Sequence, residues 1–137
     1  MSYTYDQINI GDTSSFSKTL SESDVYQFAG ITGDLNPMHI NEVAASQTPF
    51  GGRIVHGCLV DSLISTVLGM QYPGPGTIFM EKSVKYLAPV KIGDTVTARV
   101  EVTEKLPKGT VVLKADYTNQ DGTPVAVGEV KVKAPRN

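Results

Sequence analysis

The chain has 137 residues and a mass of 14.7 kDa, the size of one ordinary domain with one hydrophobic core. Apolar residues make up 40% of the chain and charged residues 19%, a balance that excludes an intrinsically disordered protein. Twelve basic and fourteen acidic residues leave a net charge of −2, so charge offers no argument for a nucleic-acid partner and we expect none.

Targeting and redox signals are also weak. The N-terminus lacks the basic and apolar regions of a signal peptide, and no stretch approaches the ~18 consecutive apolar residues of a membrane span. The one cysteine, Cys58, excludes an intrachain disulfide, and its apolar neighbours predict a small buried side chain. We therefore expect a soluble cytoplasmic protein with no membrane partner.

The first elements are a strand and a helix. Residues 14–20 are predicted to form a strand after an extended entry. A helix is predicted over 21–32, because Ser21 can cap it and apolar residues then recur at helical spacing. Gly33 is typical of the position just after a helix end.

The middle of the chain is predicted to hold a loop and two further helices. Pro37 forces Asn36 away from the helical region, so residues 34–39 are not predicted as an ordinary helix. A short helix is expected at 41–46. The longest helix is predicted at 56–70, and its apolar residues cover more than one face, which predicts burial on most sides.

The remainder of the chain has the pattern of strands. Apolar and polar residues alternate from Thr95 to Val102, as in a half-buried strand, and Asp121-Gly122 indicates a hairpin. The predicted strands are 77–87, 95–102, 111–119 and 124–133. Helices followed by hairpin-connected strands predict an α+β fold in one domain over residues 1–137, with an antiparallel sheet curled around the long helix.

One short segment carries residues suited to catalysis. Asp34 and His39 flank the Asn-Pro break, which bends the chain and can bring the carboxylate and the imidazole to one side. Such a pair can bind and activate one water molecule. The alternative is a structural turn, in which Asp34 and Asn36 bond nearby backbone groups and His39 is a half-buried polar residue.

A second segment leads into the long helix. Gly57 would lie at the helix start, where N–H groups lack intrahelical acceptors, so its N–H is a candidate oxyanion donor. The alternative is that this glycine only relieves crowding. A metal site of Asp34, His39 and His56 is disfavoured, because no CxxC or HExxH spacing supports it. A nucleophilic pair of Cys58 and His56 is disfavoured because residues two apart on a helix diverge.

Taken together, these segments resemble a known family. The stretch from Phe28 to His39, then Phe50, then Ile54-Val55-His56-Gly57, resembles the hydratase signature of MaoC-like (R)-specific enoyl-CoA hydratases. The resemblance extends over nearly the whole chain, through Tyr86–Val90 and Gly93-Asp94. It implies the hot-dog fold, an antiparallel sheet wrapped around a long central α-helix, in agreement with the pattern of elements.

The resemblance also implies a reaction. Asp34 and His39 would be a catalytic dyad that adds water to a trans-2-enoyl-CoA and yields an (R)-3-hydroxyacyl-CoA, with the Gly57 N–H stabilising the enolate oxygen. No cofactor or metal is implied. Ser65 would hydrogen-bond the aspartate, with Ser62 as a rival, and Asn36 would fix the loop.

Partners follow from the same resemblance. We expect an acyl-CoA substrate of short to medium chain length and at least a homodimer with the substrate tunnel at its interface. Candidates for binding the CoA phosphates are Arg53, Lys82, Lys85 and Lys91.

Two alternatives stay open. A hot-dog acyl-CoA thioesterase would need a carboxylate on the central helix, and Asp61 is the candidate there. A non-catalytic acyl-CoA-binding subunit would bind CoA esters without turnover. Release of CoA from a saturated acyl-CoA would indicate the first, and binding without turnover the second.

Overall fold

The computed structural model of the protein describes residues 1–136. Its strands form a five-stranded antiparallel sheet in the order β1-β3-β4-β5-β2. Their bounds are β1 Thr13–Thr19, β2 Ile78–Tyr86, β3 Thr95–Leu106, β4 Thr110–Thr118 and β5 Pro124–Lys133. Hairpins join β3 to β4 and β4 to β5, while β1 and β2 form the two edges of the sheet.

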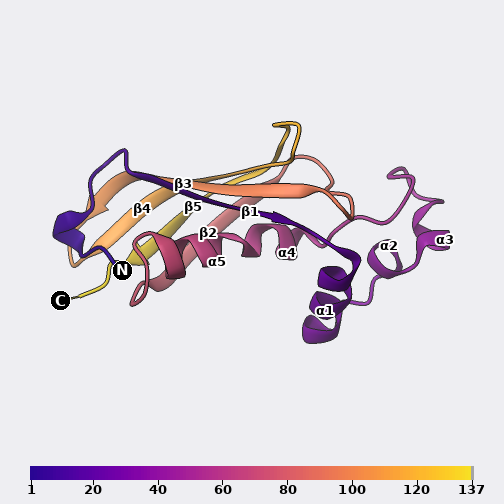
Figure 1. Cartoon of the computed structure of the whole chain (residues 1–137), viewed down its shortest axis with the longest axis horizontal. Helices are drawn as coiled ribbons and strands as arrows, with labels where there is room; N and C mark the ends of the chain where they lie inside the picture. The colour runs from indigo at the N-terminus through magenta and orange to yellow at the C-terminus, as the bar shows by residue number, and fades with distance from the viewer. Residues whose placement is uncertain (137) are drawn as a thin grey trace.

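The helical elements occupy the first half of the chain. Their bounds are η1 Tyr5–Gln7, α1 Glu22–Thr32, α2 Pro37–Ile40, α3 Glu42–Ala45, α4 Gly57–Ser62, α5 Ile64–Thr66 and the π-helical turn η2 Val67–Gln71. Leu63 is itself helical, so α4, α5 and η2 make one continuous central helical segment. Figure 1 shows the sheet along one side of this segment, α1–α3 at one end of the molecule and both termini at the other.

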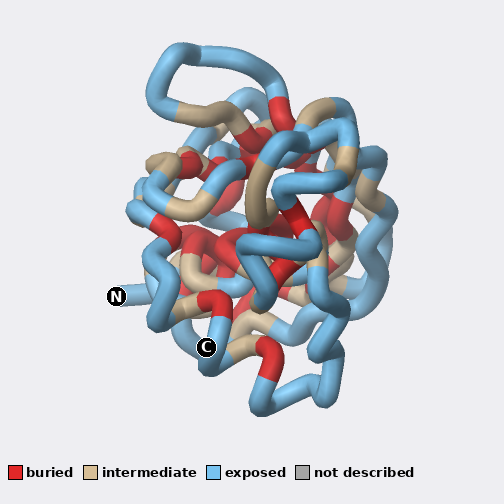
Figure 2. Tube along the Cα trace, turned by 90° about the vertical axis from the view of Figure 1, so that its right-hand side faces the viewer, coloured by how far each residue is buried: buried red, intermediate tan, exposed pale blue. Residues whose placement is uncertain are grey.

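The core lies between the sheet and the central helical segment. The predicted alternation in β3 is confirmed, because every second residue from Val96 to Val102 is buried. From the helical side, Ile64, Val67 and Leu68 are at most 1% exposed and belong to the same cluster. Each such side chain contributes roughly 1.5–3 kcal/mol through burial. Figure 2 shows buried positions gathered toward the middle of the molecule and exposed ones around them.

The predicted caps of α1 are confirmed, but residues 34–39 differ from the prediction. Ser21 accepts a hydrogen bond from the Asp24 N–H, and Gly33 ends the helix with φ 82°. Pro37 begins the one-turn helix α2, so the prediction of a non-helical segment there is wrong for its last three residues. Proline is well suited to the first helical position, and Asn36 satisfies the restriction before proline by acting as the N-cap.

The central helical segment is less buried than predicted. Cys58, Ser65 and Met70 are exposed, so the predictions of a helix buried on most sides and of a buried cysteine are wrong. The sheet covers one side of the segment and leaves this opposite stripe open. No helix among residues 1–136 has the length and apolar character that crossing a membrane requires.

Strand β3 is four residues longer than predicted. The pairing with β4 shifts register between Val102 and Glu104, and the strand then continues to Leu106. Such an irregularity interrupts the period-two pattern. The strand predicted from the alternation therefore ends at Val102, where the register shift begins.

Candidate active site

The turn after α1 is held by its own side chains. The Asp34 N–H donates to Thr32 Oγ1 at 3.1 Å, and Asp34 Oδ1 accepts from the Asn36 N–H at 3.2 Å. Asn36 Oδ1 accepts from the Met38 N–H at 3.1 Å and so caps α2. The structural-turn interpretation of Asp34 and Asn36 therefore describes their backbone contacts correctly. The same contacts orient the Asp34 side chain, which stays 51% exposed.

His39 is held in one tautomer. Its ring is only 7% exposed, and Nδ1 lies 2.7 Å from the carbonyl oxygen of Ile54. Because a carbonyl can only accept, Nδ1 carries the proton and donates it. In the neutral ring, Nε2 is therefore the acceptor, which is the state that a general base requires.

His56 brings the carboxylate and the imidazole together. It is 2% exposed and stacks on His39, with 3.9 Å between ring centroids and 24° between ring planes. Its Nε2–H donates to the Asp34 carbonyl oxygen at 3.1 Å and lies 4.0 Å from Asp34 Oδ2. One polar atom from each of Asp34, His39 and His56 lies within 4.8 Å of the other two. The pattern of the sequence indicates His56 only as a metal ligand or thiol partner and does not predict this supporting role.

These three residues do not form a good metal site. Each histidine uses one ring nitrogen as a donor to a backbone carbonyl. The other ring nitrogen of each histidine and the Asp34 carboxylate make three possible ligands, one short of the four that close a structural zinc site. The arrangement is suited to holding a water molecule between a carboxylate and an imidazole.

Gly57 begins the central helical segment directly after His56. No acceptor among residues 1–136 bonds its N–H, as is usual for the first residue of a helix. A Cβ atom at this position would lie 3.0 Å from Cε1 and Cζ of Tyr86. A side chain here would therefore crowd the Tyr86 ring, and the N–H can donate to a ligand.

An apolar cavity of about 480 Å³ opens beside Gly57. It lies between the start of the central helical segment and the chain that leaves β2. Its lining includes Phe50, Val55, Tyr86 and Val90. A volume of this size falls in the range of small-molecule sites.

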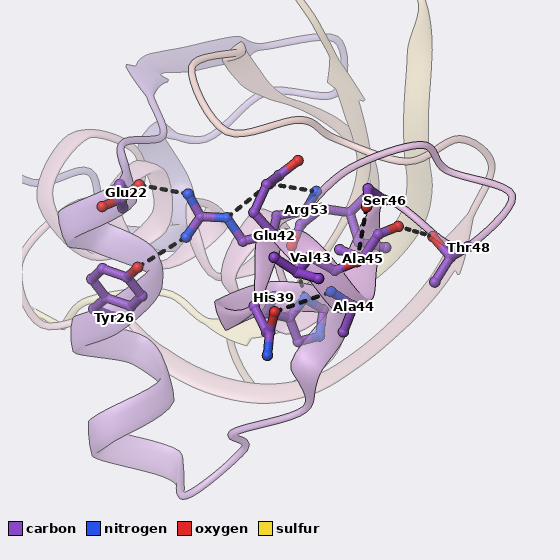
Figure 3. Close-up of polar contacts among 12 residues, drawn as sticks. Glu22, Tyr26, His39, Glu42, Val43, Ala44, Ala45, Ser46, Thr48 and Arg53 are labelled. Atoms are coloured by element: carbon purple, nitrogen blue, oxygen red, sulfur yellow. Dashed lines mark hydrogen bonds and ion pairs between the residues drawn. The ribbon is translucent and has the colours of Figure 1, made fainter.

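Arg53 ties α1 and α3 to the segment that precedes His56, as Figure 3 shows. Its side chain donates to Glu22 at 2.5 Å, to Glu42 at 3.1 Å and to the Tyr26 hydroxyl at 3.0 Å. The hydrogen bond to Glu22 is the largest cause of a raised pKa for Arg53. These contacts engage Nε and both Nη atoms of Arg53, so Arg53 is a clamp and not a free cation for CoA phosphates.

The other candidate cations differ in their partners. Lys82 lies 2.5 Å from Asp61, and Lys91 donates to the Phe50 carbonyl oxygen. Lys85 is exposed on β2, and no partner bonds it among residues 1–136. Of the predicted phosphate-binding candidates, Lys85 therefore has the freest side chain.

The predicted serine contact to Asp34 is not made within this chain. Ser65 is exposed and has no hydrogen bond to Asp34 among the described residues. Ser65 also lies eight residues, or about 12 Å, along the helix from Gly57. Its rival Ser62 donates to the Leu59 carbonyl oxygen at 2.6 Å instead.

Asp61 is buried and fully engaged. It is 2% exposed, accepts from the Tyr86 hydroxyl at 2.8 Å and pairs with Lys82. Loss of water around the hydroxyl, and then its hydrogen bond to Asp61, raise the pKa of Tyr86, although the residue as a whole is 51% exposed. The Tyr117 hydroxyl donates to the Asp61 carbonyl oxygen at 3.1 Å.

The chain is similar to known proteins over most of its length. Residues 7–122 match the model of the MaoC like domain family. The chain is 46% identical to an (R)-specific enoyl-CoA hydratase of Rhodospirillum rubrum, over 96% of this chain and 91% of that protein. It is 42% identical to a 3-hydroxybutyryl-CoA dehydratase of Methylorubrum extorquens, over 96% of this chain and 84% of that protein.

The fold is shared with solved structures. An R-hydratase from Pseudomonas aeruginosa in the unliganded form superposes with a TM-score of 0.94 at 36% identity, over 98% of this chain and 86% of that chain. The predicted α+β hot-dog fold is therefore confirmed.

Proposed function

The chain is a member of the MaoC-like domain family, and we propose that it is an (R)-specific enoyl-CoA hydratase. It adds water reversibly to trans-2-enoyl-CoA esters of short to medium chain length and yields (R)-3-hydroxyacyl-CoA. The enzyme is a hydro-lyase, and its substrate is an acyl-CoA. The relatives that carry hydratase or dehydratase names support this assignment, because they align with nearly the whole chain.

In this proposal, water is held between the Asp34 carboxylate and Nε2 of His39. The dyad removes a proton from the water, whose oxygen forms a bond to the β-carbon of the enoyl thioester. The π electrons move toward the thioester oxygen, where the Gly57 N–H stabilises the enolate. A proton is then returned to the α-carbon, which completes the addition of water without cofactor or metal.

The single observation that carries the proposal is the state of His39. Its Nδ1–H bond to Ile54 leaves Nε2 as an acceptor, and a ring nitrogen of His39 lies within 4.8 Å of a carboxylate oxygen of Asp34. Asn36 supports the same geometry by capping α2 and by donating its N–H to Asp34.

The geometry disfavours the thioesterase alternative. That reaction would need the Asp61 carboxylate to activate a water molecule. Both Asp61 oxygens are already engaged, one by Tyr86 and the other by Lys82, and Asp61 does not line the cavity.

We propose that the active enzyme is a homodimer. The edge strand β2 is exposed on both faces and carries Ile78, Phe79 and Met80 with 62%, 41% and 50% exposure. An edge strand whose outer side is unpaired, and whose first residues are exposed and apolar, is a ready template for a second chain. Ser65 is exposed on the central helical segment, so a second chain can reach it, and we assign its contribution to the Asp34 carboxylate to the assembled dimer. Light scattering on the purified protein measures its mass, and we expect twice the 14.7 kDa of one chain.

The test of the function is direct. The purified protein is mixed with crotonyl-CoA, loss of the enoyl absorbance is followed, and the product enantiomers are resolved. We expect rapid loss with formation of (R)-3-hydroxybutyryl-CoA. Butyryl-CoA is the matched control because it lacks the double bond, and release of free CoA from it would identify a thioesterase. Binding of both esters without turnover would identify a binding subunit.

A further inference from the structure

His56 connects the turn that carries Asp34 to the start of the central helical segment. It occupies the N-cap position of α4, directly before Gly57, and is 2% exposed. The reaction proposed above uses Asp34, His39 and Gly57 and gives His56 no step. The contacts of this buried polar side chain therefore need an explanation of their own.

Aromatic contacts restrict the His56 ring. Phe28, on α1, lies with 4.9 Å between the ring centroids and 58° between the ring planes. His39, on α2, stacks on the same ring at 3.9 Å and 24°. Two contacts from two different helices leave the ring little freedom to rotate, so its nitrogens keep fixed directions.

The hydrogen bond of His56 shows where its proton lies. Nε2 is 3.1 Å from the Asp34 carbonyl oxygen, which can only accept, so Nε2 carries the proton of the neutral ring. Nδ1 is buried and has no partner among residues 1–136. The other tautomer would leave an Nδ1–H without an acceptor and would turn a lone pair toward the carbonyl oxygen. The two histidines therefore hold opposite tautomers, with the bare nitrogen at Nε2 in His39 and at Nδ1 in His56.

These contacts let one residue set the spacing between two parts of the proposed site. The Nε2–H of His56 holds the backbone of Asp34, and its ring holds the ring of His39. The next N–H along the chain is that of Gly57, which would meet the enolate oxygen. Water and thioester must be held together in one geometry, and a misplacement of about 1 Å can cost about 10²-fold in rate.

We propose that His56 is a positioning residue for the hydration reaction, which fixes the distance between the Asp34–His39 pair and the Gly57 N–H through its Nε2–H. It acts through these residues, since it does not line the cavity beside Gly57. The inference rests on the proposed function, because it concerns the same reaction.

Three substitutions separate the hydrogen bond of His56 from its packing. His56→Gln places an amide N–H near the position of Nε2. His56→Asn carries the same amide on a side chain one methylene shorter, so its N–H lies near the position of Nδ1. His56→Phe keeps a ring against His39 and has no donor. For each variant, kcat and KM for crotonyl-CoA are measured beside the thermal midpoint.

The order of the three kcat values decides between positioning and packing. We expect kcat to fall about 10²-fold in the asparagine and phenylalanine variants and to stay within about ten-fold in the glutamine variant. KM should stay within about three-fold in all of them, because the cavity is unchanged. If His56 only fills space, the phenylalanine variant would be nearest the wild type and the two amides would be equal. That order, or a wild-type kcat in all three variants, would overturn the proposal.

Nitrogen NMR on the untagged, ¹⁵N-labelled wild type tests the hydrogen bond without turnover. The chain has two histidines, so two sets of ring-nitrogen signals are expected, and the set that remains in His39→Gln belongs to His56. A protonated ring nitrogen and a bare one have well-separated shifts. We expect the proton of His56 on Nε2 and that of His39 on Nδ1. A His56 proton on Nδ1 would overturn the proposal.

The two tests keep this inference distinct from the proposed function. A wild type that does not hydrate crotonyl-CoA would reject the function, whatever tautomers the spectrum shows. An active wild type with the reversed tautomer of His56, or with a phenylalanine variant that exceeds the glutamine variant, would leave the function standing and reject the role of His56.

Discussion

The molecule has two regions that are stabilised in different ways. The layer of the sheet and the central helical segment is held by apolar side chains, among them Leu113 and Val100, which are fully buried. The segment from Gly33 to His56 holds two buried histidines and is organised by side-chain hydrogen bonds and the Arg53 clamp. The contrast teaches that the first region gives the protein its stability through apolar burial. The second region holds reactive side chains in place with hydrogen bonds and depends little on apolar burial.

The largest expected effect comes from replacing the base in the reactive segment. His39→Gln removes the acceptor nitrogen but keeps a side-chain donor for the Ile54 carbonyl oxygen. We expect kcat with crotonyl-CoA to fall about 10³-fold, as for loss of a general base. Turnover is measured beside the thermal midpoint of the same preparation. A variant that stays within ten-fold of the wild type would remove His39 from the chemistry.

A substitution in the apolar layer is expected to lower stability and to leave turnover unchanged. Leu113→Ala creates a cavity in β4, and such substitutions cost roughly 2–5 kcal/mol of unfolding free energy. Denaturant unfolding measures the loss, and kcat per folded molecule should stay near the wild-type value. Lys114→Ala is the matched control, because the neighbouring side chain is 57% exposed and should change little. A large loss of kcat in folded Leu113→Ala would break the separation of the two regions.

The Arg53 clamp, which ties the reactive segment to α1, should give an intermediate effect. Arg53→Lys keeps the charge but cannot reach Glu22, Glu42 and Tyr26 together. We expect kcat/KM to fall several-fold and the unfolding free energy to fall by about 1 kcal/mol, since exposed pairs contribute little each. Arg99→Lys changes a pair with Glu101 far from the site and serves as control. Equal effects from both variants would argue against a positioning role for Arg53.

The smallest effect concerns acid stability at the far end of the molecule. The hydrogen bond from the Tyr72 hydroxyl, and then that from the Asn9 N–H, lower the pKa of Asp12 in the folded state. A lowered folded pKa stabilises the protein above the unfolded pKa of about 3.9, and this contribution is lost as pH falls through the folded pKa. Tyr72→Phe should therefore be less stable than the wild type at pH 7.

Unfolding curves taken at several pH values measure this loss. The difference in unfolding free energy between Tyr72→Phe and the wild type should become smaller below pH 4. Asp12→Asn is the control, because it removes the titrating group and should make the difference independent of pH. If the difference does not change with pH while Asp12 is present, the lowered pKa of Asp12 is not its cause.

Most of the sheet could be predicted because its signals are local. Alternation in β3 and turn residues such as Asp121-Gly122 need only neighbouring positions. The one-turn helix at Pro37 was missed, because proline before a single turn resembles a helix breaker in sequence. The open stripe with Cys58 and Ser65 was missed, because apolar content does not say which side of a helix the sheet covers.

The site was predicted in part for a similar reason. Asp34 and His39 lie five residues apart and could be paired from the chain itself. The stacking of His56 on His39 and the contact of Asp61 with Tyr86 join residues 17 and 25 positions apart. No local pattern reports such pairs. The available signal for the stacking of His56 on His39 was that the chain has only these two histidines.

The central claim is that the Asp34 carboxylate is needed for turnover and is not needed for the stability of the fold. Asp34→Asn tests it most directly, because Asp34 is half exposed and an asparagine oxygen can still accept from the Asn36 N–H. Hydration of crotonyl-CoA and the thermal midpoint are measured on one preparation. We expect kcat to fall at least about 10²-fold with little change in the midpoint. Turnover within three-fold of the wild type, in a variant that melts normally, would contradict the claim.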